Sequence, residues 1–113
     1  MELGFLIEFA RTFFLGLWFL SPVLAAFLLA IVLLGRMIGK REGWSRGDAI
    51  YYAFITASTV GYGDFRPRTG LGKILAIIIA LCGLLLTGIV VAISLQALNI
   101  AFKEVYDVAE ITG

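Results

Sequence analysis

Long apolar runs alternate with short polar links along this chain. The runs cover residues 3–20, 22–38 and 71–98, and a shorter, mainly apolar stretch lies at 46–58. Apolar stretches of ten residues or more without strict alternation favour helices over strands. The pattern therefore predicts an all-helical chain in which the polar links mark the helix ends.

The run at 22–38 is interrupted by a single charged residue, Arg36. Its 17 residues would form a helix of about 25 Å, and a hydrocarbon core is about 30 Å thick. The segment therefore spans a bilayer if it gains a turn at either end. Ser21 followed by Pro22 is a typical helix start. We predict an outer helix at 21–39.

The N-terminal run leaves two structures open. Glu2, Glu8 and the absence of an Ala-x-Ala site argue against a signal peptide. Residues 1–20 are then either a helix that lies in the membrane interface or the start of the outer helix.

The third run is the longest. Leu71 to Leu98 would form a helix of about 42 Å, so it exceeds a bilayer and a tilt is expected. We predict an inner helix at 70–102 and a short polar tail at 103–113. Leu84, Thr87, Val91, Leu95 and Asn99 recur at spacings of three and four along it, which indicates one continuous helix face.

The stretch at 46–58 is too short to span. Ser45 precedes Asp48 by three residues, as at a capped helix start. A helix of 13 residues reaches only about 20 Å. Such a half-depth helix directs the negative end of its dipole toward the membrane centre, where it stabilises a cation.

A loop rich in glycine and hydroxyl groups follows, from Thr56 to Asp64. Irregular backbone at membrane depth is tolerated where protein buries it or where it lines a water-filled path. If successive carbonyls are to point the same way, alternate residues must adopt unusual φ and ψ angles, which glycine does without steric cost. Gly61 and Gly63 alternate with Val60 and Tyr62 as this geometry requires.

The five residues from Thr59 to Gly63 resemble the selectivity filter of potassium channels. The resemblance implies that K⁺ is the permeant ion and that Thr59, Val60, Gly61 and Tyr62 coordinate it. One chain supplies one ladder of oxygens, whereas a cation needs a ring of them. The resemblance therefore implies a homotetramer around one axis, and the 45–64 segment becomes the pore helix and filter.

Supporting roles are implied by the same resemblance. Gly63 and Asp64 would hold the filter, and the aromatic pair Tyr51 and Tyr52 would buttress it from the pore helix. Some bacterial members of the family place a glutamate where this chain has Ile55, and that glutamate holds the aspartate. Tyr51 is therefore the expected partner of Asp64, while interface anchoring is the alternative for both tyrosines.

The inner helix carries the expected gate. Gly83 lies twenty residues beyond Gly63, where the family places its hinge, although a glycine can equally permit close helix packing. Thr87 is expected just below the filter, and Val91 and Leu95 are candidates for an apolar constriction.

Composition places the chain in lipid. Hydrophobic residues make up 61% and charged residues 15%, against about 45–50% and 25% in soluble domains. A net charge of +1 implies no nucleic-acid partner. There is no histidine, and the one cysteine is Cys82, so we expect no enzyme and no small-molecule substrate. The fold class predicted is an all-α membrane protein, a single pore domain over 1–113 that assembles as a tetrameric pore.

Charge leaves the orientation open. The family resemblance implies a cell membrane location with cytoplasmic termini. Basic residues instead gather on the filter side, seven against Arg11 and Lys103 on the terminal side, which by the positive-inside rule places the filter mouth in the cytoplasm. An inverted pore of the prokaryotic glutamate-receptor type and a non-conducting or regulatory pore-like subunit are the alternatives. The seven are Arg36, Lys40, Arg41, Arg46, Arg66, Arg68 and Lys73.

Overall fold

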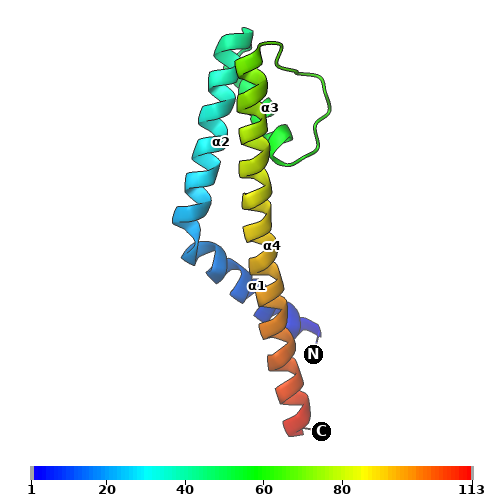
Figure 1. The fold of residues 1–113 in the computed structure, drawn as a ribbon. Coiled ribbons are helices and arrows are strands. Elements are labelled where there is room, and N and C mark those ends of the chain that lie inside the picture. The colour runs from blue at the N-terminus through cyan, green and yellow to red at the C-terminus, as the bar shows by residue number, and fades with distance from the viewer. Residues whose placement is uncertain (1, 113) are drawn as a thin grey trace. The chain divides into compact units, whose positions relative to one another are not determined.

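The chain is all-helical, as predicted. A computed structural model describes the backbone of residues 2–112 and the side chains of residues 2–105. It contains four helices and, over those residues, no strand (Figure 1). The helices are α1 (Glu2–Phe19), α2 (Ser21–Glu42), α3 (Arg46–Ala57) and α4 (Gly70–Thr112).

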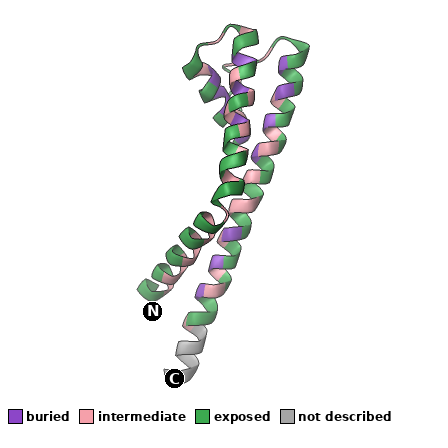
Figure 2. Cartoon of the chain, turned by 90° about the vertical axis from the view of Figure 1, so that its left-hand side faces the viewer, coloured by how far each residue is buried: buried purple, intermediate pink, exposed green. Residues whose placement is uncertain are grey.

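Contacts divide the chain into two compact units, which are described separately. The filter unit is Val23–Thr87, and the terminal unit combines Met1–Pro22 with Gly88–Gly113. Helix α4 contributes to both. Few residues are buried in either unit, and most of the surface of the long helices is exposed (Figure 2).

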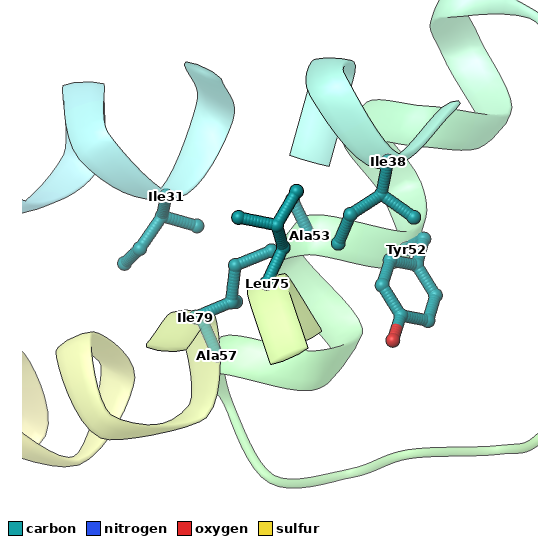
Figure 3. Close-up of a cluster of buried hydrophobic side chains, with 7 residues drawn as sticks. All are labelled: Ile31, Ile38, Tyr52, Ala53, Ala57, Leu75 and Ile79. Carbon is teal, nitrogen blue, oxygen red and sulfur yellow. The ribbon is translucent and has the colours of Figure 1, made fainter. Parts of the chain in front are cut away.

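The core of the filter unit is a small cluster between three helices. Ile31 and Ile38 of α2 and Ile79 of α4 are almost fully buried there. They meet the inward face of α3, which supplies mainly alanine, so the short helix packs against both long ones (Figure 3). The cluster is Ile31, Ile38, Tyr52, Ala53, Ala57, Leu75 and Ile79.

Small residues let α3 approach α2 closely. A Cβ added at Gly35 would lie 2.5 Å from the Cβ of Ala53, and one added at Gly39 would lie 2.5 Å from the Cβ of Ala49. The two glycines are four residues apart and so share one face of α2, the small-xxx-small pattern of packed membrane helices. This glycine pair was not predicted, although its spacing inside an apolar run is a readable signal.

The end of α2 differs from the prediction. The helix continues through the expected polar link to Glu42 instead of ending near residue 39. Gly43 has φ of +74°, and the Trp44 amide donates to the Gly39 carbonyl at 2.9 Å. This is a glycine-terminated helix end of the Schellman type, and Lys40 and Arg41 in the last turn complement the helix dipole. Ser45 then caps α3 and accepts from the Asp48 amide at 3.2 Å, as the sequence indicated.

Outside the filter unit, one boundary agrees with the prediction and one differs. The chain breaks between α1 and α2 at Leu20, so of the two structures left open for the N-terminal run, Glu2–Phe19 forms a helix separate from α2. Helix α4 runs on to Thr112, through most of the expected polar tail. No glycine or proline interrupts residues 103–112, so nothing in the sequence stops the helix there.

Within the terminal unit, α1 packs against the end of α4. The rings of Phe5 and Phe102 lie 4.9 Å apart, and a Cβ added at Gly16 would lie 2.7 Å from a methyl group of Ile93. Ala97 and Ala101 of α4, which lie between Ile93 and Phe102 in the sequence, are fully buried. Small residues on both helices therefore bring the two backbones close together.

Among the described residues, two helices are long and apolar enough to cross a bilayer, by length and composition. They are Ser21–Glu42 and Gly70–Val105 within α4. The first has 22 residues, about 33 Å as a helix, so it needs no borrowed turn.

Candidate functional site

The filter loop leaves α3 through an unusual backbone. After the C-cap at Ser58, φ is +65° at Thr59, +52° at Gly61 and +83° at Gly63. Positive φ therefore occurs at every second residue, as expected for a loop with alternating backbone conformation. The glycines were predicted to fill this role, whereas Thr59 was not. A β-branched residue at positive φ is strained, and no sequence signal marks it.

Hydrogen bonds tie the start of the loop to the last turn of α3. The Ser58 amide donates to the Phe54 carbonyl at 2.9 Å, and the Gly61 amide donates to the Ile55 carbonyl at 3.2 Å. The Thr59 hydroxyl donates to the Ser58 carbonyl at 2.6 Å. Its oxygen lone pairs remain able to face a cation. The filter is thus an extension of the pore helix and is fixed at that end.

An aromatic cluster flanks the loop. The Trp44 ring lies 5.0 Å from the Tyr52 ring and 5.3 Å from the Phe65 ring, and Tyr51 lies 6.2 Å from Phe65. These separations suit edge-to-face and tilted packing. The structure therefore packs the two predicted tyrosines against Trp44, which precedes the pore helix, and Phe65, which follows the filter. Trp44 and Phe65 were missed, although both are aromatics that flank this segment.

Asp64 lies in the electrostatic environment of Tyr51. Desolvation is the main cause that raises the pKa of the Tyr51 phenol, and the nearby Asp64 carboxylate raises it further. A carboxylate beside a phenol favours the protonated phenol, which can donate to it. The two groups are therefore near enough to influence each other, and a Tyr51–Asp64 hydrogen bond stays a prediction.

Gly83 of α4 lies against the C-terminal end of α3. A Cβ at this position would overlap the backbone of Ala57, including its carbonyl oxygen. Gly83 is buried, and α4 is continuous through it. The contact supports the packing role that the sequence left open, and a hinge role stays a prediction.

The expected pore-lining residues are exposed along α4. Thr87, Val91 and Leu95 each face away from the packed sides of their units. Their spacing of four keeps them on one helix face. Their roles in a cavity or a gate stay predictions.

Comparison with known proteins identifies the family. A family model described as "Ion channel" matches residues 5–99. This chain belongs to the ion channel family. No solved structure matches it.

The relatives of this ion channel chain are named potassium channels. A putative potassium channel protein of Rhodopseudomonas palustris is 40% identical over 52 residues, 46% of this chain and 13% of that protein. Potassium channel protein 1 of Methanocaldococcus jannaschii is 52% identical over 42 residues, 37% and 13% of the two chains. A human voltage-gated potassium channel regulatory subunit is 35% identical over 96 residues, which are 84% of this chain and 21% of that protein.

The comparisons confirm the resemblance seen in the filter sequence. The chain is a potassium-channel type of membrane domain, and its family transports ions, in agreement with the expectation that it is not an enzyme. The chain spans about a fifth or less of the length of these relatives.

Glu42 anchors the link from the channel filter to α4. Its carboxylate accepts from the Arg68 amide at 2.5 Å, from the Thr69 hydroxyl at 2.8 Å and from the Thr69 amide at 3.3 Å. The Thr69 hydroxyl in turn accepts from the Gly72 amide at 3.0 Å and caps α4. The end of α2 is therefore joined to the start of α4 by one carboxylate, which sequence reasoning did not single out.

Replacing Glu42 by glutamine is expected to lower the melting temperature of the protein in detergent, on the order of 5 °C. A glutamine has one acceptor oxygen instead of two, and it loses the charge that strengthens all three bonds. Glu104→Gln is the matched control, since Glu104 is an exposed carboxylate of α4 without a hydrogen-bond partner in the described part of the chain. Equal melting temperatures for the two variants would contradict an anchoring role.

Proposed function

We propose that this chain forms a homotetrameric pore for the passive, potassium-selective movement of ions across the cell membrane. The observation that carries the proposal is the alternation of positive φ at Thr59, Gly61 and Gly63 within a filter sequence. A backbone that alternates in this way can direct successive carbonyls toward one side. The membership of the chain in the ion channel family supports the same function.

Coordination of K⁺ is assigned to the filter backbone. Thr59, Val60, Gly61 and Tyr62 each supply one carbonyl per chain, and four chains supply four oxygens at each level. Rings of carbonyls replace the hydration shell of K⁺ in such filters. Gly63, Asp64, Tyr51 and Tyr52 support them.

The exposure of the filter in the single chain gives a physical reason for a tetramer. Val60 and Tyr62 are 51% and 71% exposed in the single chain. Backbone polar groups at membrane depth cost several kcal/mol each when they face lipid. Three further chains would cover these side chains and enclose the carbonyls around a water-filled axis. Native mass measurement in detergent is expected to give four chains, and an active monomer or dimer would contradict the assembly.

The remaining parts of the pore are assigned by the same family resemblance. Helix α2 serves as the outer helix, α3 as the half-depth pore helix and α4 as the inner helix, within a single pore domain. Thr87 lines the cavity below the filter, and Val91 and Leu95 form an apolar constriction that closes by dewetting. The filter mouth faces outward and both termini face the cytoplasm.

A second function is supported by one comparison. The human relative that is aligned over 84% of this chain is named a regulatory subunit. A chain of that kind would join the pore of another channel and change its properties without conducting alone. Purified protein that assembles but carries no K⁺ by itself would favour this function over the first.

Wild-type protein in a planar bilayer is expected to give a reversal potential close to that of K⁺, with K⁺ on one side and Na⁺ on the other. Tyr62→Asp is expected to shift the reversal potential toward zero, because the phenol ring that braces the carbonyls from outside is lost. Trp18→Phe is the control variant, since Trp18 is an aromatic residue of the terminal unit and is 80% exposed. A wild-type reversal potential near zero would remove the claim of selectivity.

A further inference from the structure

Arg66 contacts the last carbonyl of the filter sequence. Its Nε atom donates to the Gly63 carbonyl at 3.1 Å. The Arg66 side chain folds back over the glycine. A Cβ added at Gly63 would lie 3.3 to 3.7 Å from three of its guanidinium atoms. Gly63 therefore offers its carbonyl to a fixed cation of the same chain instead of to a permeant ion.

The positive charge of the Arg66 guanidinium is not paired with a carboxylate in the described part of the chain. Arg66 lines a cavity of about 880 Å³ at the filter mouth, together with Asp64, Glu42, Arg68 and Lys73. The Glu42 carboxylate is already bound to the backbone and hydroxyl donors of the α4 link, and Asp64 lies beside Tyr51. Among the described residues, the one salt bridge joins Glu8 and Arg11. No carboxylate of the described residues therefore forms a salt bridge with Arg66.

Arg68 provides an internal comparison. It carries the same charge and lines the same cavity, two residues further along the chain. Its backbone amide, however, donates to the Glu42 carboxylate. Its guanidinium donates to no filter carbonyl in the described structure. The two arginines thus differ in contact with the filter and not in charge.

We propose that Arg66 sets the rate at which K⁺ passes the mouth end of the filter. Its guanidinium removes the Gly63 carbonyl from the oxygen ladder, so the ladder ends at Tyr62. In the assembled pore, four such cations form a ring where an ion enters or leaves. Like charges repel, and a charged ring at a pore mouth changes the local ion concentration and the entry rate. The proposal rests on the proposed function, since it needs a conducting tetramer.

The test is single-channel K⁺ current in planar bilayers at low and high ionic strength. Arg66→Gln is expected to raise the current carried by ions that enter from the filter mouth by about 3- to 10-fold near 10 mM salt. The gain is expected to fall below about twofold near 1 M salt, where the Debye length is about 3 Å. Arg66→Lys keeps the charge and is expected to stay within about twofold of wild type at both concentrations.

Arg68→Gln is the matched control and is expected to raise the current by less than Arg66→Gln. Equal gains for the two variants would overturn the proposal, because they would reflect general surface charge and not the filter contact. A current from Arg66→Lys equal to that of Arg66→Gln would also overturn it, because the charge would then have no effect. A wild type that carries no K⁺-selective current overturns the proposed function itself, so the two failures are distinguishable.

A second measurement tests the proposal if the Arg66→Gln variant does not assemble. Arg66→Cys channels are recorded before and after a thiol reagent that attaches either a cationic or a neutral group of similar size. The cationic group is expected to lower the current and the neutral group to leave it high, with reagent-treated wild type correcting for Cys82. Equal responses to both reagents would overturn the proposal.

Discussion

Gly61→Ala is expected to abolish K⁺-selective flux while the protein still inserts and assembles. Gly61 has φ of +52°, where a side chain costs about 1–2 kcal/mol. No heavy atom lies within 4 Å of the added Cβ in the single chain, so the helices have no reason to move. The backbone relieves the strain by leaving positive φ, which breaks the alternation between Thr59 and Gly63 and turns carbonyls away from the axis.

Flux into liposomes under K⁺ and Na⁺ gradients measures this loss, together with the mass of the assembly. Gly43→Ala is the matched control. Gly43 also has positive φ, +74°, and no atom within 4 Å of an added Cβ, but it lies in the turn that ends α2. The two variants therefore share the same backbone strain. Normal selective flux in Gly61→Ala would show that the filter does not depend on that geometry, and a loss in both variants would point to folding.

Much of the fold could be predicted because the bilayer imposes strong rules. The outer and inner helices follow from apolar runs of spanning length, and the half-depth helix follows from a run too short to span. The boundaries were less predictable. At Gly39 the sequence suggests a break, yet the helix continues because the missing side chain admits Ala49, and it ends instead at Gly43. A glycine that ends a helix and a glycine that packs one look alike in sequence.

The site divides in the same way. The filter residues and the tyrosine pair could be proposed from the sequence because they lie in a short, contiguous segment, and their roles stay predictions. The contacts of Glu42 and Arg66 could not be predicted, because they depend on where a carboxylate and a guanidinium lie in space. Glu42 meets Arg68 across 26 positions of sequence. Thr59 was missed for a different reason, since its positive φ opposes its own preference and is imposed by the turn that precedes it.

The last large effect is expected at Gly83. Gly83→Ala should lower the stability of the assembly and impair selective flux together. The added methyl would overlap the Ala57 backbone at the end of the pore helix, and backbone cannot rotate aside as a side chain can. Overpacking of this kind costs about 1–3 kcal/mol. The strain acts one residue before Ser58, whose amide and hydroxyl join the filter to α3.

Gly88→Ala is the matched control on the same helix. No atom lies within 4 Å of its added Cβ, and alanine is favoured over glycine in a helix interior by about 1 kcal/mol. Its melting temperature in detergent is expected to rise while that of Gly83→Ala falls. If Gly83→Ala is instead as stable as Gly88→Ala but opens less often in single-channel recordings, the glycine acts as a hinge. The packing contact with Ala57 instead predicts that Gly83→Ala is less stable than Gly88→Ala and has a disturbed filter. Both effects would arise from one overlap, at the point where the pore helix and the inner helix meet.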